Sequence, residues 1–190
     1  MPKGIVFTPS LPDPRSGFVL DTHDLSRGAG DVLEVSRVVE APADLGLDMI
    51  GVPLGSPIAL NLQLSSVGEG VLVTGTAEVL LKGNCTRCLE EISSTELIDV
   101  QELFCYPGKE LDDEEASRIE GTLIDLEPIL RDCVVLDLPF TPLCRQDCAG
   151  LCPTCGVDLN VNPDHRHTEA IDARWSSLAQ WAQTEDETKN

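Results

Sequence analysis

Four closely spaced cysteines are the feature of this chain that most clearly indicates chemistry. Cys144, Cys148, Cys152 and Cys155 alternate with polar residues and glycines in the stretch L-C-R-Q-D-C-A-G-L-C-P-T-C-G, which begins at Leu143. Side chains in this pattern cannot all enter one packed core, whereas converging thiolates are common ligands of structural zinc. The C-P-T-C-G end of the stretch is typical of a zinc knuckle, a tight turn whose backbone N–H groups bond the sulfurs. We therefore interpret the stretch as part of a metal site.

Further metal-capable side chains lie elsewhere in the sequence. A second C-x-x-C pair is formed by Cys85 and Cys88, and His165 and His167 form an H-x-H pair after Cys155. Together with the cluster they make eight potential ligands, enough for two tetrahedral sites.

These ligands can be paired in three ways. The cysteines of the cluster could bind one ion by themselves, but three-residue spacers make a cramped loop around an ion with Zn–S bonds of about 2.3 Å. A zinc ribbon would join the Cys85/Cys88 pair to the Cys152/Cys155 pair and leave Cys144 and Cys148 without a role. We favour a third pairing that uses every closely spaced ligand, with Cys85, Cys88, Cys144 and Cys148 in one site and Cys152, Cys155, His165 and His167 in the other.

Three remaining side chains of these types have simpler interpretations. Cys133 falls on the apolar stripe of an expected helix and Cys105 ends an expected strand, so we interpret both as small core residues. His23 stands alone before Asp24 and is expected at the surface.

The charge of the chain limits the kinds of partner that it can bind. The 190 residues carry 13 basic and 33 acidic side chains, a net charge of −20. This charge repels phosphate, so it argues against a broad surface for bare RNA and favours a basic protein partner.

The apolar runs of the sequence bear on the location of the protein. No apolar run is long enough for a membrane span, and the first residues lack the apolar core of a secretion signal. We therefore expect a cytoplasmic protein with reduced thiols and no membrane partner.

The elements that must position the ligands can be read from apolar periodicity. Alternating residues predict a β-hairpin over 58–81 that runs directly into the Cys85/Cys88 knuckle, and apolar residues resume at Ile92, so the knuckle should lie at a tip between two strands. Strands are also predicted at 17–20 and 32–39, and a short helical turn at 44–49. Asp125 is predicted to N-cap a helix over 125–138 that ends before Pro139, and a second amphipathic helix is predicted from Asp172.

Period-two patterning without alternating β and α units predicts an α+β fold, mainly an antiparallel β-sheet with a few helices and a zinc-binding, cysteine-rich C-terminal module. We expect an N-terminal arm at 1–16, a β-rich core domain at 17–140, the zinc-binding module at 141–183 and a polar tail at 184–190. The charged segment 110–120 is expected to be a solvated loop.

An ordered set of motifs resembles a known family. It comprises Gly17-Phe-Val-Leu-Asp, Ser66-Val-Gly-Glu-Gly-Val-Leu-Val-Thr-Gly-Thr, Cys85-Thr-Arg-Cys88-Leu-Glu, Asp125-Leu-Glu-Pro-Ile-Leu-Arg-Asp, and Gly150-Leu-Cys-Pro-Thr-Cys-Gly-Val-Asp-Leu-Asn. Together these motifs, which cover nearly the whole chain, resemble the bacterial and plastid YceD family, also called DUF177. The resemblance implies a factor in 23S ribosomal RNA accumulation and large-subunit production. Many relatives have C-x-C where this chain has His165-Arg-His167, which is consistent with an exchange of metal ligands.

The leading hypothesis is therefore a non-catalytic assembly factor, stabilised by two structural zinc ions, that binds a basic ribosomal protein or a large-subunit precursor. A zinc hydrolase or nucleobase deaminase is the first alternative. The deaminase pattern has a proline directly before its C-x-x-C pair, whereas here the proline falls inside the pair Cys152-Pro-Thr-Cys155, and four protein ligands leave no position for water. The second alternative is a thiol redox protein that uses Cys152 and Cys155, which would need this pair at the start of a helix after a strand.

Overall fold

The computed structural model describes residues 12–25, 30–108 and 117–167. The chain divides into two compact units, Met1–Cys148 and Ala149–Asn190. Each unit is described by itself below.

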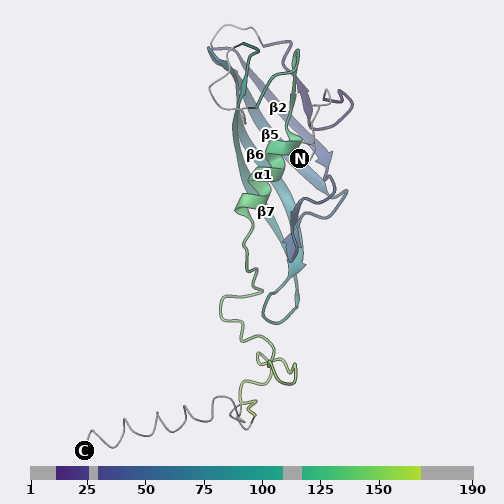
Figure 1. Cartoon of the computed structure of the whole chain (residues 1–190), viewed down its shortest axis with the longest axis vertical. Coiled ribbons are helices and arrows are strands. Elements are labelled where there is room, and N and C mark those ends of the chain that lie inside the picture. Colours follow the sequence, from purple (N-terminus) through teal and green to yellow (C-terminus); the bar gives the residue numbers. More distant parts are fainter. Residues whose placement is uncertain (1–11, 26–29, 109–116, 168–190) are drawn as a thin grey trace, which may run out of the picture. The chain divides into compact units, whose positions relative to one another are not determined.

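The first unit is built around a long antiparallel sheet (Figure 1). Its main strands pair in the order β2 (Val32–Glu40), β5 (Pro57–Ser66), β6 (Gly70–Asn84) and β7 (Glu91–Cys105). A short hairpin of β3 (Gly46–Leu47) and β4 (Ile50–Gly51) adds to the far end of β6, where Ile50 pairs with Gly83. The predicted antiparallel sheet is thus confirmed.

Alternating side chains give the sheet one buried face. Ile58, Leu60 and Leu64 on β5 are at most 2% exposed, while Asn61 and Gln63 between them are exposed. The chain turns at 67–70 into β6, where the alternation continues through Val71, Val73, Val79 and Leu81. The predicted hairpin is therefore present, and it lies at the centre of the sheet.

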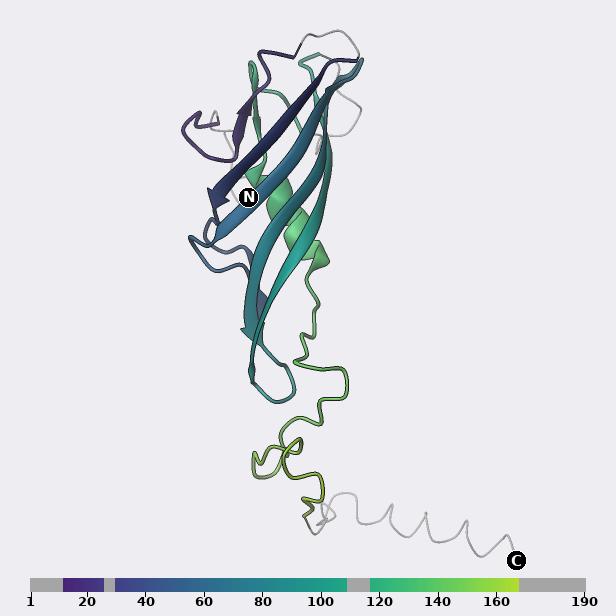
Figure 2. The same cartoon turned by 180° about the vertical axis from the view of Figure 1, so that it is seen from behind.

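The helix α1 (Glu127–Asp137) covers part of the buried face (Figure 1). It packs against β7 and β3 and buries Leu130 and Val134 in the same core as the sheet residues. A small second sheet pairs β1 (Val19–Asp21) with β8 (Leu123–Asp125) just before the helix. Figure 2 shows the opposite face of the main sheet, on which no helix of the described residues lies. No helix of the described residues is long and apolar enough to cross a membrane.

Two local predictions were wrong. Residues 44–49 form no helical turn, because β3 and β4 pair through two glycines whose backbones approach so closely that a Cβ on Gly46 would collide with the Cα of Gly51. The N-cap of α1 is Leu126 instead of Asp125. Asp125 still pairs with Val19 as the last residue of β8, and its carboxylate accepts a hydrogen bond from the backbone N–H of Glu127 at 2.9 Å.

Other predictions fall wholly or partly outside the described residues. The C-terminal helix from Asp172 and the polar tail lie in 168–190, and most of the N-terminal arm and of the charged loop lies in 1–11 and 109–116. The predicted domain boundaries remain predictions.

Candidate metal centres

The first ligand pair, Cys85 and Cys88, lies on the turn that joins the two longest strands. β6 and β7 stay paired until Asn84 meets Glu91, so the knuckle begins directly where the ladder ends. Backbone hydrogen bonds from Cys85 N–H to the Glu90 carbonyl and from Leu89 N–H to the Cys85 carbonyl, at 2.8 and 2.9 Å, close the turn. The rigid ladder therefore fixes where these two thiols point.

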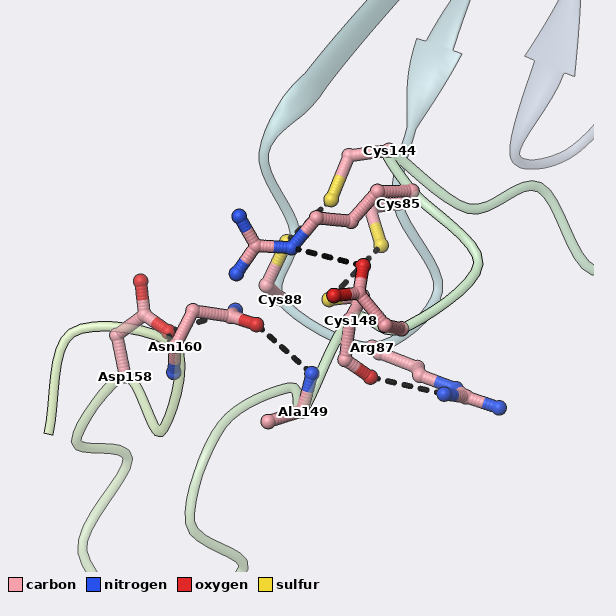
Figure 3. Close-up of polar contacts among 10 residues, drawn as sticks. Cys85, Arg87, Cys88, Cys144, Cys148, Ala149, Asp158 and Asn160 are labelled. Atoms are coloured by element: carbon pink, nitrogen blue, oxygen red, sulfur yellow. Dashed lines mark hydrogen bonds and ion pairs between the residues drawn. The ribbon is translucent and has the colours of Figure 1, made fainter. Parts of the chain in front are cut away.

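The second ligand pair comes from the segment that follows α1. Thr86 donates its backbone N–H to the carbonyl of Pro142 at 2.9 Å, and Arg87 donates from Nη1 to the carbonyl of Cys148 at 2.8 Å. These contacts hold Cys144 and Cys148 against the knuckle, and Figure 3 shows the four cysteine side chains turned toward one another. The role of Arg87 in this contact was not predicted, because it links residues that are far apart in the sequence.

The sulfur positions of this set, which we call the four-cysteine centre (Cys85, Cys88, Cys144 and Cys148), fit a tetrahedral ion. All four Sγ atoms lie within 4.8 Å of one another. Cys85 Sγ is 3.8 Å from Cys148 Sγ and Cys88 Sγ is 3.5 Å from Cys144 Sγ. Ideal tetrahedral zinc with Zn–S bonds of about 2.3 Å places its sulfurs about 3.8 Å apart, whereas a disulfide needs an S–S distance of about 2 Å. The donor set and its spacing therefore suit zinc.

The electrostatics of the four-cysteine centre also suit a cation. Burial acts to raise the pKa of the Cys85 thiol, but the backbone N–H groups of Cys144, Cys88 and Arg87 outweigh burial and lower this pKa to about 6. Burial and the sulfurs of Cys88, Cys148 and Cys85 raise the pKa of Cys144 to about 12. One thiolate is thus stabilised by N–H groups while burial and the other sulfurs oppose a second negative charge. A divalent cation at the centre would remove that opposition.

The second set lies entirely within the second unit, and we call it the cysteine–histidine centre (Cys152, Cys155, His165 and His167). Cys152 and Cys155 lie on a tight turn in which the Gly156 N–H bonds the Cys152 carbonyl at 2.8 Å, and Gly156 has a φ of 72°, which favours glycine. The backbone N–H groups of Thr154 and Cys155 lower the pKa of the Cys152 thiol to about 6. N–H groups directed at a cysteine sulfur are typical of zinc knuckles.

The two histidines approach this turn with the same ring nitrogen. Nε2 of His165 lies 3.1 Å and Nε2 of His167 lies 3.2 Å from Cys155 Sγ, and the two Nε2 atoms are 2.9 Å apart. All four ligand atoms lie within 4.8 Å of one another. Tetrahedral zinc would hold such atoms about 3.3–3.6 Å apart, so the rings need to move by only a few tenths of an ångström to admit an ion.

Two residues that the sequence did not single out support this turn. The Asn160 side-chain oxygen accepts the backbone N–H of Ala149 at 2.7 Å, and the Asp158 carboxylate accepts the backbone N–H of Asn160 at 2.8 Å (Figure 3). Both belong to the motif G-V-D-L-N that directly follows the cysteine pair. Their position in that motif indicated that both residues matter, but it did not indicate which backbone groups they would bind.

The structure thus gathers the eight predicted ligands into the two favoured sets. The remaining residues of these types stand apart from them: Cys105 is buried, Cys133 is half-buried against the core, and the side chain of His23 is 78% exposed. Metal binding by either set remains a prediction.

The two centres differ in exposure, which predicts two rates of metal loss. Cys85 and Cys148 are buried, whereas Cys155 and His167 are exposed. Excess EDTA added to zinc-loaded protein should therefore remove one equivalent in a fast phase and one in a slow phase, as measured with a colorimetric zinc indicator. The variant Cys155→Ser should lack the fast phase only. Release of both equivalents in one phase would contradict the assignment.

Comparisons with known proteins identify the family of this chain. The family model described as "Large ribosomal RNA subunit accumulation protein YceD" matches residues 73–181, which include all eight predicted ligands. An uncharacterized protein of Mycobacterium tuberculosis is 41% identical over 177 residues, which cover 91% of this chain and 85% of the relative. An uncharacterized protein of Mycobacterium leprae is 38% identical over 168 residues, covering 86% and 76%, and the uncharacterized protein YlbN of Bacillus subtilis is 26% identical over 117 residues, covering 60% and 67%.

No solved structure matches the chain. The family description assigns its members to the accumulation of the large ribosomal RNA subunit, and the match extends over more than half of the chain, from β6 of the main sheet through the cysteine–histidine centre. The protein therefore belongs to the YceD family.

Proposed function

We propose that this protein is a non-catalytic factor that supports the accumulation of 23S ribosomal RNA and the production of the large ribosomal subunit. The observation that carries the proposal is the family match over residues 73–181. The same residues hold both centres, so the part of the chain that defines the family is the part that zinc would stabilise.

Zinc would act as a structural ion in both centres. The four-cysteine centre would join the tip of β6 and β7 to the segment after α1, and the cysteine–histidine centre would close the turn of the second unit. Four protein ligands complete a tetrahedral shell and leave no position for a water molecule that an enzyme could activate. Such a closed shell favours a structural role over the hydrolase and deaminase alternatives.

The redox alternative lacks its structural context. A thioredoxin-like pair needs Cys152 and Cys155 at the start of a helix, where the helix lowers the thiol pKa. Residues 152–155 form a turn instead, and the described residues that follow them, up to His167, contain no helix. The low pKa of Cys152 arises from the local N–H groups of the knuckle.

The proposed partner is a basic ribosomal protein or a precursor particle that presents one. With 33 acidic and 13 basic residues, the protein has few cations available to neutralise phosphate. Several arginines also have contacts within the protein: Arg87 binds the Cys148 carbonyl, Arg131 pairs with Glu127, and Arg145 pairs with Asp147. These contacts favour a protein partner over a broad RNA-binding face. Location in the cytoplasm is part of the proposal.

Depletion of the protein tests this function. In a strain whose only copy can be switched off, the ratio of mature 23S to 16S ribosomal RNA should fall and large-subunit precursors should build up, as measured by gel analysis of total RNA and by sucrose gradients. Expression of the wild-type chain should restore the ratio, whereas a chain with Cys85 and Cys88 both changed to Ser should not. An unchanged 23S to 16S ratio after depletion would refute the proposal.

A further inference from the structure

Two large apolar side chains near the end of α1 lie in solvent. Leu136 is 83% exposed and Phe140 is 86% exposed. Phe140 is notable because aromatic residues make up only 4% of the chain and the described Phe18 and Phe104 are buried. Aromatic residues are enriched among the side chains that dominate protein interfaces.

Residues of the segment that carries Phe140 line two hollows in the surface of the first unit. One has a volume of about 410 Å³ and is lined by Ile50, Leu81, Ile92, Pro139, Pro142 and Leu143, among others. The other, of about 380 Å³, is lined by residues 46–50, Pro139 and Phe140. Because Ile50 and Pro139 line both, the two hollows adjoin, and we call them together the Phe140 groove.

The floor of the Phe140 groove is part of the hydrophobic core. Ile50 and Leu81 are 5% and 3% exposed and belong to the main core cluster. An apolar side chain that entered the groove would therefore touch residues that the fold already holds in place. Such pre-organisation lowers the entropic cost of binding.

The rim of the groove is negatively charged. Asp48, Glu96 and Asp137 line it and are exposed, and none of the described residues that line it is basic. Within the described part of the chain, none of these three carboxylates forms an ion pair. An apolar floor with an unpaired acidic rim complements an apolar side chain that is flanked by cations.

We propose that the Phe140 groove is the docking site for a basic protein segment, in which an apolar residue enters the groove and neighbouring Lys or Arg side chains meet Asp48, Glu96 and Asp137. The inference rests on the proposed function, since it names the surface through which a basic ribosomal protein would bind.

Charge disfavours three other occupants of the groove. RNA would bring phosphates against the acidic rim, and a second copy of this chain would bring a net charge of −20. The chain's own residues 168–190 contain more acidic than basic side chains, so they would also meet the rim with the same sign of charge.

Site-specific photocrosslinking identifies the occupant directly. The photoreactive amino acid benzoylphenylalanine replaces Phe140 in the full-length protein, cells are irradiated during growth, and the crosslinked peptides are sequenced by mass spectrometry. The matched control carries the same amino acid at Leu54, which is 75% exposed and lines neither hollow. We expect position 140, and not position 54, to crosslink to ribosomal-protein segments in which Lys or Arg flanks an apolar residue.

Every other outcome of this experiment overturns the proposal. Crosslinks from position 140 to RNA, to a second copy or to residues 168–190 would assign the groove to a different occupant. Equal crosslinking from positions 140 and 54, or no crosslink from position 140, would show that the groove is not a specific docking site.

A binding assay measures the energetic importance of Phe140. The probe is the mixture of proteins extracted from purified large subunits and freed of ribosomal RNA, and it is passed over the immobilised full-length protein. We expect Phe140→Ser to weaken capture of the crosslinked protein by about 30-fold, the effect of losing one interface anchor, and Leu54→Ser to leave it unchanged. Glu96→Gln with Asp137→Asn should weaken capture and reduce its dependence on salt. Because Phe140 is exposed, Phe140→Ser should melt at the wild-type temperature, so wild-type capture by this variant would refute the proposal.

The groove and the proposed function can fail separately. If depletion lowers 23S ribosomal RNA but Phe140→Ser restores it as well as the wild type does, the groove assignment is wrong and the function stands. If depletion has no effect on the RNA, the function is wrong, while photocrosslinking at position 140 still decides whether a basic segment occupies the groove.

Discussion

Replacing Cys88 by Ser is expected to remove one of two bound zinc ions and to destabilise the sheet unit. The Cys88 sulfur lies 3.5 Å from that of Cys144, on the turn that ends the longest strand pair of the sheet. Without a fourth thiolate, the ion would lose one of the bonds that join this turn to the segment after α1. A thousand-fold loss of zinc affinity removes about 4 kcal/mol of linked stability, a large part of the roughly 5–15 kcal/mol typical of a domain.

Cys133→Ser provides a matched control for this prediction. Cys133 is half-buried, as Cys88 is, but lies outside both centres. Metal analysis by mass spectrometry should return one zinc per chain for Cys88→Ser and two for Cys133→Ser. Thermal unfolding followed by circular dichroism should show a much larger loss of stability for Cys88→Ser. Two equivalents of zinc in Cys88→Ser would show that the assignment of the four-cysteine centre is wrong.

The main sheet could be predicted because its pattern is local. Ile58, Leu60 and Leu64 alternate with polar residues over a full strand, and the glycines at 68–70 mark the turn, so each residue's neighbours determine its face. The pairing of β6 with β7 followed from the same pattern on both sides of the knuckle. The predictions that failed concern places where tertiary contacts outweigh local preference.

The hairpin at 46–51 illustrates that failure. Asp44 to Met49 has a composition that a helical turn tolerates, but Gly83 leaves room beside β6 that the backbone of β4 fills, since a Cβ there would lie 2.8 Å from the Cα of Ile50. This close approach involves residues more than thirty positions apart and could not be read from either segment alone. The position of Asp125 was similarly decided by its pairing with Val19 across the small sheet.

The ligands of the candidate site could be predicted from nearby residues, whereas the contacts that bring the ligands together could not. Thiol and imidazole spacing was sufficient to nominate the ligands, because few other arrangements explain so many of them in so short a stretch. The hydrogen bond from Arg87 to Cys148, which helps to bring two distant pairs together, has no counterpart in the spacing. The exposure of Phe140 also could not be predicted, since an isolated aromatic residue between two prolines is compatible with a buried or an exposed position.

Replacing Cys155 by Ser should unfold the second unit locally and change the stability of the first unit little, whereas Cys88→Ser destabilises the first unit. Among residues 149–167, Cys152 is the single buried apolar side chain, so this segment has no hydrophobic core of its own. In such small modules the free energy of metal binding is the free energy of folding, on the order of 10 kcal/mol per zinc site. Without Cys155, which both histidine rings approach within 3.2 Å, the turn is expected to lose its ion and its structure together.

Trypsin cleavage at Arg166 measures this local unfolding, because Arg166 lies between the two histidine ligands. Cleavage should be slow in zinc-loaded wild type and in the control Thr154→Ala, whose side chain is exposed. It should be fast in Cys155→Ser, while the melting temperature of the sheet unit stays at the wild-type value.

The double variant with Cys88→Ser and Cys155→Ser distinguishes the two ways of pairing the ligands. Two independent centres predict one zinc in each single variant and none in the double variant. A ribbon that shares one ion between the Cys85/Cys88 and Cys152/Cys155 pairs predicts one zinc in the wild type and none in either single variant, and that result would overturn the two-centre assignment.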